Sequence, residues 1–384
     1  MNILIIHNRY KLAGGEDTVM ENEGNLLKEH GHNVYYYVRD NKEITEMNLL
    51  KKAGAFFGTV YSFRAYRDVE KLIKENKIDV VHIHNTVPLV SWSVYSAAKK
   101  YGCKLVQSVH NMRLLCPSAL MIRDNRVCED CLKKGLKCAA IHGCYKDSRL
   151  YSAALAFALW FHRKTGSFKK VDAYLYTTEF NRKLLSRVIP EDKLFYKPYY
   201  SDAKVKDPEG KKRDYYIYIS RLEYLKGIQV ALEAFKKLPE HKLLVLGVGP
   251  DEERSRRYVE DNHMENVTFL GFKNKAEMTE LLYNAKALVF PTQWYEGFPM
   301  TIVESLACGT PVIGSDIGNV GTIVKDGING LRFRYDDSND LVEKIRYFEE
   351  HPAEVKKMES GAIKDFNDNH TPEAVYEMTM RIYW

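Results

Sequence analysis

The chain has 384 residues, of which 45% are hydrophobic and 28% are charged, and its formal net charge is +6. This length exceeds the usual size of one domain, so we expect two domains that each bury a core. No apolar run approaches the roughly 20 residues of a membrane span, so we expect a soluble globular protein. The mildly basic charge is compatible with anionic substrates or an acidic membrane surface and identifies neither.

Short apolar segments typical of buried strands alternate with helical stretches along most of the chain. In the first half, these segments are residues 2–7, 33–38, 80–84 and 104–109. In the second half, they are residues 215–220, 242–247, 266–271, 287–290 and 311–314. The alternation predicts βαβ units, and hence an α/β protein with two doubly wound, Rossmann-like domains.

The alternation is interrupted twice, and the second interruption predicts the domain boundary. The first lies between residues 112 and 170, and the second is the polar linker-like segment SDAKVKDPEGKKRD. We therefore expect an N-terminal domain, a C-terminal domain and a final helix that crosses back to the N-terminal domain. Their predicted bounds are 1–200, 201–365 and 366–384. A cleft between two such domains is a favoured place for a ligand.

The stretch QWYEGFPMTIVESLACGTPVIGSD contains two carboxylates, Glu296 and Glu304. Glu296 follows the predicted strand ALVF, and Pro299 suits the first position of a helix that carries Glu304 about two turns further on. Loops at the carboxyl ends of parallel strands bind ligands in open α/β sheets. The alternative is that Glu296 is a favourable charge near a helix N-terminus and Glu304 a solvated helix residue.

Three other segments in the second half place candidate binding residues after a predicted strand. Arg221 and Lys226, in SRLEYLKG, combine a planar fork with a flexible charge and suit a diphosphate. Gly247 and Gly249, in LGVGP, allow a ligand to approach the backbone, and Phe272, in VTFLGF, offers a ring on which a base could rest. The alternatives are solvated surface charges and ordinary turn residues.

In this order and spacing, SRLEYLKG, LGVGP, VTFLGF and EGFPMTIVE resemble the nucleotide-sugar domain of family 4 glycosyltransferases. These enzymes have the GT-B fold, in which two Rossmann-like domains face each other across a cleft. The last segment matches the family's E-x7-E signature. The stretch AGGEDTVMENEGNLLKEHGHNVYYY resembles the family's glycine loop and first helix, and SVHN resembles its mid-domain histidine segment.

The resemblance implies a role for each carboxylate and for the helix between them. Glu296 would contact hydroxyls of the donor sugar, and Glu304 would hold the ribose diol of the nucleotide. A carboxylate suits both tasks, because it accepts hydrogen bonds from two adjacent hydroxyls. The helix N-terminus at Phe298 to Thr301 would present its backbone N–H groups to the sugar or diphosphate, proline excepted. The expected donor-binding positions here are Gly297, Phe298, Pro299, Met300 and Thr301.

The resemblance also implies that catalysis needs no cofactor. Arg221 and Lys226 would neutralise the departing diphosphate in place of the metal that other glycosyltransferases hold with a D-x-D motif, which this sequence lacks. His110 would lie near the reacting end of the sugar, although a lone histidine is more often structural. Gly14 and Gly15 would let acceptor and diphosphate approach the backbone. Family members retain the anomeric configuration, so we expect a retaining enzyme.

Five of the seven cysteines lie in an insertion at about 112–147, where Cys128 and Cys131 form a C-x2-C. Disulfides are disfavoured in a cytosolic protein, so the pattern indicates a structural zinc site, with free thiols as the alternative. The expected ligands are Cys116, Cys128, Cys131 and Cys144. A similar insertion occurs in a subset of the same family, and its position after His110 puts it beside the acceptor cleft.

Directly after the insertion, LYSAALAFALWFHRKTGSFKK combines about a dozen apolar or small residues with a basic end. It is either a core helix with a solvated end or a helix, at about residues 150–161, that contacts a membrane surface.

The features together favour a retaining, hexosyltransferase-type glycosyltransferase. It would move a sugar from a nucleoside-diphosphate sugar, with UDP favoured, to a sugar or lipid-linked hydroxyl acceptor in cell-surface polysaccharide or glycolipid synthesis. One alternative is a GT-B sugar-nucleotide epimerase. The other is a zinc-containing nucleic-acid-binding protein, but its basic residues would form a stripe that this sequence lacks, so we expect no nucleic-acid partner. The start MNILIIHNRY resembles a strand rather than a signal peptide, so we expect a cytoplasmic protein, with peripheral membrane contact left open.

Overall fold

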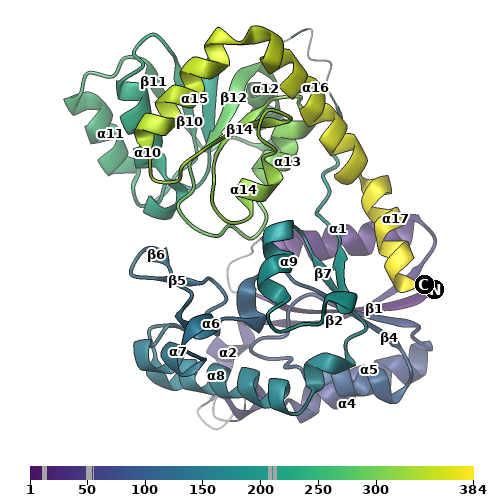
Figure 1. Cartoon of the computed structure of the whole chain (residues 1–384). Coiled ribbons are helices and arrows are strands. Elements are labelled where there is room, and N and C mark those ends of the chain that lie inside the picture. Colours follow the sequence, from purple (N-terminus) through teal and green to yellow (C-terminus); the bar gives the residue numbers. More distant parts are fainter. Residues whose placement is uncertain (11–14, 49–53, 55, 206–209, 211–213) are drawn as a thin grey trace. The chain divides into compact units, whose positions relative to one another are not determined.

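The computed structural model describes the chain except for residues 11–14, 49–53, 55, 206–209 and 211–213 (Figure 1). The chain divides into two compact units. The first unit comprises residues 1–123, 128–197 and 376–384, and the second comprises residues 124–127 and 198–375. The division after Lys197 lies close to the boundary predicted at the polar linker, and the last residues of the chain group with the first unit.

The first unit is built on six parallel strands in the order β2-β1-β3-β4-β7-β8. Their bounds are Asn2–Arg9 for β1, Asn33–Asp40 for β2, Val80–Ile83 for β3, Lys104–Ser108 for β4, Ala173–Tyr176 for β7 and Leu194–Tyr196 for β8. The strands β1, β3 and β7 are buried almost throughout, which explains their near-continuous apolar sequences. Strand order reverses between β1 and β3, which makes their carboxyl ends the switch point of this sheet.

The helices of the first unit are unequal in length. Their bounds are Gly15–Glu29 for α1, Glu43–Glu46 for α2, Phe63–Asn76 for α4, Val94–Lys100 for α5, Asp130–Lys133 for α6, Lys137–His142 for α7, Arg149–Lys164 for α8 and Glu179–Leu185 for α9. Met20 and Leu27 of α1 pack against Ile3 and Ile5 of β1, and Tyr383 near the C-terminus joins the same core. The cysteine-rich segment contains α6, α7 and a two-stranded ribbon, β5 (Ile122–Arg123) and β6 (Arg126–Val127).

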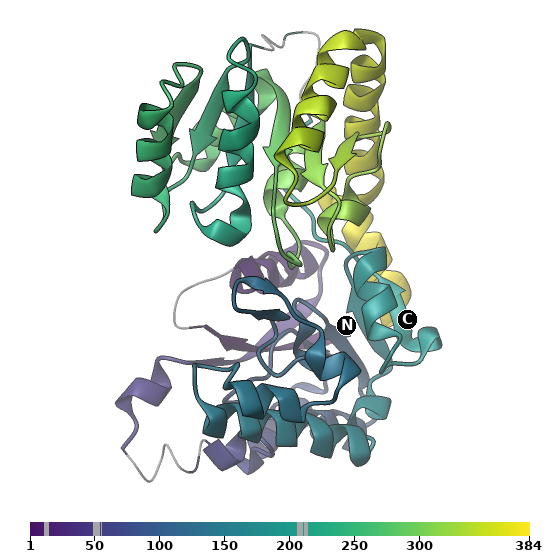
Figure 2. The same ribbon diagram turned by 60° about the vertical axis from the view of Figure 1, so that its left-hand side comes forward.

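The second unit has six parallel strands in the order β11-β10-β9-β12-β13-β14. Their bounds are Tyr215–Ile219 for β9, Leu243–Leu246 for β10, Val267–Gly271 for β11, Ala285–Phe290 for β12, Val312–Ser315 for β13 and Gly330–Phe333 for β14. Successive residues of β9 enter different cores, since Tyr216 and Tyr218 belong to one cluster and Ile217 and Ile219 to another. Figure 2 shows helices on both sides of this sheet.

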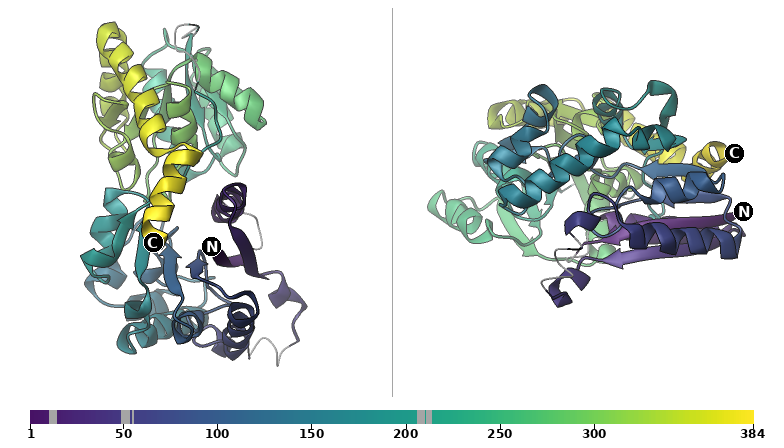
Figure 3. Two further views of the ribbon diagram at one scale, coloured as in Figure 1. Left: turned by 90° about the vertical axis from the view of Figure 1, so that its right-hand side faces the viewer. Right: turned by 90° about the horizontal axis from the view of Figure 1, so that it is seen from below.

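The helices of the second unit follow its strands. Their bounds are Ile228–Lys236 for α10, Glu252–Asp261 for α11, Lys275–Asn284 for α12, Met300–Ala307 for α13, Val320–Ile323 for α14, Ser338–Glu350 for α15 and Pro352–Asn369 for α16. The predicted α/β class with two parallel, doubly wound sheets is confirmed. In place of the single final helix predicted for residues 366–384, α16 ends and α17 (Pro372–Tyr383) begins (Figure 3, left). Proline has no N–H and favours the first turn of a new helix.

None of the helices in the described part of the chain is long and apolar enough to cross a membrane.

Candidate functional site

The candidate site of the second unit lies where its strand order reverses. Strands β9 and β12 are hydrogen-bonded neighbours there, and each is followed by a loop. The loop after β9 carries Arg221 and Lys226, and the loop after β12 carries Glu296. Ligands of doubly wound sheets bind at the carboxyl ends of such strands. The fold therefore brings two separate sequence motifs to one edge of the sheet.

Lys226 and Glu296 form an ion pair at this edge. The Nζ of Lys226 lies 2.8 Å from each carboxylate oxygen of Glu296. The side chains of Lys226 and Glu296 are only 18% and 7% exposed. The hydroxyl of Thr292 and the indole N–H of Trp294 also donate to Glu296 Oε1, at 2.9 and 2.8 Å. Glu296 is thus an ionised acceptor held by three donors, and Lys226 has a fixed position.

The loop after β9 is held against the loop after β12 by a glycine. Gly227 has φ +73°, and a Cβ atom added there would lie 1.7 Å from the carbonyl oxygen of Pro291. The N–H of Gln293 donates to the carbonyl of Leu225 at 2.8 Å. Because only glycine allows this approach, the position of Lys226 depends on Gly227.

The segment that follows Glu296 is anchored from its backbone. The buried side chain of Asn319 donates to the carbonyls of Glu296 and Gly297. Pro299 has an extended ψ of 100° and is the N-cap of α13, so the helix begins at Met300. Glu304 therefore lies about one turn into α13, rather than the two turns predicted.

Glu304 is partly buried, and burial raises the pKa of its carboxyl group. The nearby Lys275 opposes this shift and Asp202 adds to it. Because burial makes this carboxylate costly to ionise, hydrogen-bond donors stabilise its charged form strongly. The two hydroxyls of a diol would supply such donors.

The side chains of Phe298 and Met300, at the predicted donor-binding helix N-terminus, are partly buried in the second unit. The Phe298 ring lies 4.9 Å from the ring of Tyr199 and 5.9 Å from that of His370, measured between centroids. Met300 also packs against a core cluster. The rings and thioethers of apolar residues favour such contacts over solvent. Thr301 is partly exposed.

The glycines after β10 approach the chain's own backbone. A Cβ atom at Gly247, whose φ is +125°, would lie 1.9 Å from the carbonyl oxygen of Ser220, and one at Gly249 would lie 2.2 Å from that of Leu222. These glycines therefore pack the loop after β10 against the loop that carries Arg221. The sequence analysis predicted that Gly247 and Gly249 let a ligand approach the backbone closely, and this stays a prediction.

Four predicted residues either have open surroundings or lie outside the described residues. The side chain of Arg221 is 67% exposed, 3.6 Å from the carboxylate of Glu223, and Phe272 is 78% exposed. Gly15 begins α1 with nothing within 4 Å of an added Cβ atom. Gly14 lies outside the described residues.

In the first unit, His110 follows β4 and pairs with a histidine that follows β3. His110 Nε2 and His84 Nδ1 are 2.9 Å apart, and the two rings stack with centroids 5.0 Å apart. Burial lowers the pKa of His110 to about 3, and the positive charges of His7 and Lys197 add to the effect. The imidazole of His110 is therefore neutral at neutral pH and able to exchange hydrogen bonds without carrying charge.

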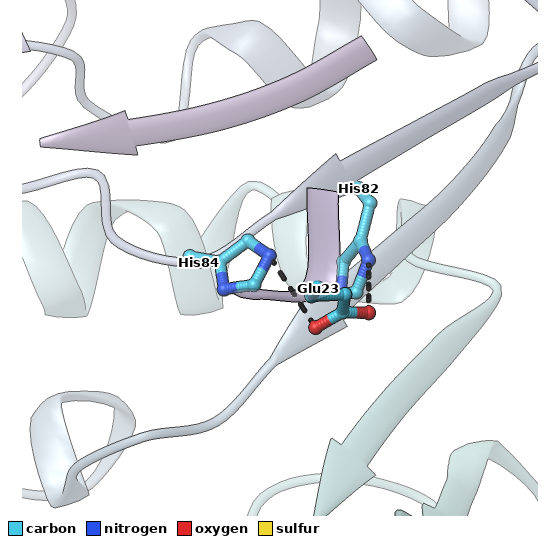
Figure 4. A group of neighbouring side chains, drawn as sticks. All are labelled: Glu23, His82 and His84. Carbon is cyan, nitrogen blue, oxygen red and sulfur yellow. Dashed lines mark ion pairs between the residues drawn. The ribbon is translucent and has the colours of Figure 1, made fainter. Parts of the chain in front are cut away.

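The side chains of Glu23, His82 and His84 form a buried cluster, which shares His84 with the histidine pair (Figure 4). Their ligand atoms lie within 4.8 Å of one another, as in a metal site. Lys197 Nζ lies 2.7 Å from Glu23, however, and His82 is bonded to Tyr383 and Ser108 at 2.6 and 2.8 Å. Because a lysine ammonium already neutralises the carboxylate, the cluster is a hydrogen-bonded network that ties α17 to the sheet.

The pKa of Glu23 shows how strongly this network is coupled. Burial opposes ionisation of the carboxyl group, but Lys197, His82 and His84 outweigh it and lower the pKa well below its usual value. Glu23 is thus a buried carboxylate stabilised by a buried cation.

Sequence reasoning missed several polar residues around His110. Asn111 donates to Glu16 at 2.7 Å, and His7 lies 2.7 Å from Asp17. A pocket at the carboxyl ends of β3 and β4 is lined by His84, Asn85, Trp92, His110, Asn111 and Arg113, among others. Polar residues directly after the buried segments VVHI and KLVQS were the available signal, since such positions lie at the binding edge of a parallel sheet.

The four cysteines expected to bind zinc lie near one another in the first unit. A hydrogen bond with Cys131, together with backbone donors at Met121 and Ser118, lowers the pKa of Cys116 to about 5. Cys144 interacts electrostatically with both Cys116 and Cys128. Among the described residues, the potential metal ligands whose atoms lie within 4.8 Å of one another are Glu23, His82 and His84, and this group does not include the cysteines.

Two family models match consecutive parts of the chain. Residues 13–196 match Glycosyltransferase Family 4, and residues 201–365 match Glycosyl transferases group 1. Each model matches just under half of the chain, the two together match most of it, and both describe glycosyltransferases.

Curated relatives share part of their length with the chain. An uncharacterized glycosyltransferase of Methanocaldococcus jannaschii is 34% identical over 31% of this chain and 34% of its own length. The glycogen synthase of Mycobacterium tuberculosis is 28% identical over 44% of this chain and 41% of its own length. The chain thus matches between a third and a half of these relatives.

Solved structures match the whole chain at low sequence identity, which shows the fold. A glycosyltransferase from Rickettsia africae has a TM-score of 0.70 at 16% identity, covering 100% of this chain and 97% of its own. Anabaena HepE in complex with UDP has a TM-score of 0.68 at 14% identity, covering 99% of each chain. HepE has also been solved in complex with UDP-glucose.

Proposed function

We propose that the protein is a retaining glycosyltransferase that moves a sugar from a nucleoside-diphosphate sugar, UDP favoured, to a hydroxyl group. The observation that carries the proposal is the Lys226–Glu296 pair at the switch point of the second unit, followed on α13 by Glu304. A cation for a diphosphate and two carboxylates for hydroxyls are the groups that such a donor requires. The UDP and UDP-glucose complexes of HepE support the choice of donor.

The proposed reaction places charge stabilisation at the leaving group. The bond between the anomeric carbon and the diphosphate oxygen breaks, and the acceptor oxygen bonds to the same carbon on the same face. The acceptor hydroxyl passes its proton to the departing diphosphate. Lys226 and Arg221 neutralise the negative charge that builds up there, which is the largest contribution that preorganised donors make to such reactions.

The two glutamates divide donor recognition. Glu304 accepts hydrogen bonds from the ribose diol, and its partial burial makes those bonds strong. Glu296 accepts hydrogen bonds from sugar hydroxyls while it keeps Lys226 in position. Binding of the donor therefore requires Lys226 to divide its three N–H groups between Glu296 and the diphosphate.

We assign the acceptor to the first unit. The pocket at His84, His110 and Asn111 offers neutral groups that can both donate hydrogen bonds to hydroxyls and accept them. The acceptor is a sugar or lipid-linked sugar of cell-surface polysaccharide or glycolipid synthesis, and the protein works in the cytoplasm. These last assignments extend the family resemblance.

Donor transfer and hydrolysis measured with UDP-, GDP- and ADP-sugars test the proposal. We expect activity with a UDP-sugar that persists in excess EDTA, because the reaction uses Arg221 and Lys226 rather than a metal. Lys226→Ala should abolish it, whereas Lys236→Ala, on the exposed side of α10, should not. Binding of single-stranded nucleic acid without any nucleotide-sugar binding would overturn the proposal. Loss of activity in EDTA that Mg²⁺ or Mn²⁺ restores would overturn its metal-independent part.

We also propose that Cys116, Cys128, Cys131 and Cys144 hold a structural zinc ion. Thiolates are the preferred ligands of such sites, and the hydrogen bond with Cys131 together with nearby backbone N–H groups lowers the pKa of Cys116 towards the charged form that zinc requires. The ion would take no part in transfer. Its contribution would be to hold together a segment whose longest helix, α7, has only 6 residues.

A further inference from the structure

Helix α8 packs one side against the first unit. Ser152, Leu155, Leu159 and His162 are buried and recur at helical spacing. His162 is anchored on both ring nitrogens, which lie 2.9 Å from the Ser167 hydroxyl and 2.7 Å from the Val60 carbonyl. This side of α8 is fully accounted for by the core of its own unit.

The opposite side of α8 is apolar and exposed to solvent. Leu150, Phe157 and Trp160 are 67%, 52% and 49% exposed. Together with Ala153, they follow the i, i+3, i+7 spacing of a single helix face. The outward face of an ordinary surface helix is polar, so these residues form a stripe that the fold of the unit leaves uncovered.

Exposed aromatic residues also occur in the first turn of α8 and in the segment that contacts it. Tyr151 is 46% exposed, and its ring centroid lies 5.8 Å from that of Phe56. Phe56 contacts Phe57 at 5.7 Å, and Phe57 is 71% exposed. Phe157 and Trp160 lie side by side, with centroids 5.6 Å apart. We call the exposed residues Phe57, Leu150, Tyr151, Phe157 and Trp160 the α8 face.

The charged residues of α8 itself are all basic, and an exposed Asp147 lies just before the helix. Residues 148–171 contain no Asp or Glu, whereas Arg149, Lys164, Lys169 and Lys170 are exposed along the same segment. Lys146 is also exposed, with Nζ 5.7 Å from the Tyr151 ring centroid. A partner for this surface must therefore offer both an apolar layer and negative charge.

We propose that the α8 face docks on the surface of an anionic phospholipid bilayer. Acyl chains would receive Leu150 and Phe157, the interfacial layer suits Trp160 and Tyr151, and lipid phosphates complement the basic residues. The apolar stripe from Leu150 to Trp160 extends roughly 15 Å along the helix, about half the hydrocarbon thickness, so α8 lies in the interface rather than across it. The sequence left open either a core helix or a helix on a membrane surface. In this proposal both apply to α8, because one side packs in the core and the other side is the docking face.

Vesicle sedimentation tests the proposal without any donor or acceptor, so its outcome is independent of the proposed transferase activity. The full-length protein should bind phosphatidylglycerol-rich vesicles and bind phosphatidylcholine vesicles at least about tenfold more weakly. Phe157→Ser/Trp160→Ser should abolish binding. Tyr335→Ser is the matched control, because Tyr335 is a comparably exposed aromatic residue of the second unit, at 53%. It should bind like wild type.

The charge component needs its own pair of variants. Lys164→Glu/Lys169→Glu should weaken binding by at least about 30-fold, since each basic residue near an anionic surface contributes a factor of about five. Lys356→Glu/Lys357→Glu makes the same charge change on exposed positions of α16 and should leave binding nearly intact.

Brominated lipids locate the contact. They should quench the fluorescence of Trp160, and Trp160→Phe should lose that quenching while still binding vesicles. Absence of vesicle binding, or equal binding to both lipids, would overturn the proposal. So would a wild-type dimer that Phe157→Ser/Trp160→Ser converts to monomer without vesicle binding, because a second copy would then be the partner of the face.

Discussion

Replacing Glu296 by Gln separates its two tasks, because the substitution keeps size and removes charge. The carboxylate holds Lys226 through two contacts of 2.8 Å. At an effective dielectric constant of about 20, unit charges at this distance attract by about 6 kcal/mol, and desolvation leaves a net value of about 1–3 kcal/mol. In the wild type, a diphosphate must compete with this attraction for Lys226.

We therefore expect Glu296→Gln to bind UDP about as tightly as wild type or up to about fivefold more tightly, corresponding to about 1 kcal/mol of released competition. Turnover should fall by about 10- to 100-fold, because a charged hydrogen-bond partner of the sugar contributes about 1.5–3 kcal/mol. Calorimetry with UDP and steady-state kinetics with the donor measure the two effects separately. Thr292→Val is the control, since it removes only one neutral donor to the same oxygen.

A double-mutant cycle checks the cause. In a Lys226→Met background, Glu296→Gln should no longer improve UDP binding, because the pair that it releases is absent. UDP binding more than about threefold weaker in Glu296→Gln than in wild type would refute the reasoning, since it would mean that Glu296 contributes to nucleotide binding and does not compete for Lys226.

Four further predictions address other parts of the molecule. Glu304→Gln should weaken UDP binding by about 1–3 kcal/mol. In the wild type, UDP affinity measured by calorimetry should decline as the pH falls through the raised pKa of Glu304, and the variant should not show this decline. Glu23→Gln should lower the free energy of unfolding in urea by about 3–5 kcal/mol at pH 7, because it leaves Lys197 buried and unpaired; since the folded-state pKa of Glu23 is lowered, this difference should shrink as the pH falls below the ordinary value of 4.5. Gly227→Ala should cost clearly more unfolding free energy than Gly31→Ala, which shares a positive φ but has nothing within 4 Å of the added Cβ atom; equal losses of about 1–2 kcal/mol would show that only backbone strain matters. Purified protein should contain close to one zinc per chain if the cysteines bind metal, and Cys128→Ser should lower both zinc content and melting temperature, whereas a fully stable, zinc-free wild type would contradict this.

The sequence alone predicted the fold class and nine of the parallel strands, but not β7, β8 or β14, which are only three or four residues long. Buried parallel strands have near-continuous apolar runs such as NILIIH and ALVF, and the turns between them contain glycine and proline, so local composition carries this information directly. The strand pattern also indicated Arg221, Lys226 and Glu296 as candidate site residues, because they lie in the loops that follow predicted strands, where parallel sheets bind ligands. The helix that carries Glu304 begins one residue later than predicted, at Met300, because Pro299 has an extended ψ angle, which composition does not specify.

Only the tertiary structure showed which of these residues meet. The Lys226–Glu296 pair joins positions 70 residues apart in sequence, and it exists because β9 and β12 are neighbours in the sheet. The His84–His110 pair likewise depends on the adjacency of β3 and β4. Phe298 and Trp160 have similar apolar neighbours in sequence, yet Phe298 is packed against Tyr199 and Trp160 is 49% exposed. Burial is a property of how elements pack, and strand order and packing arise from contacts between distant residues that no local pattern encodes.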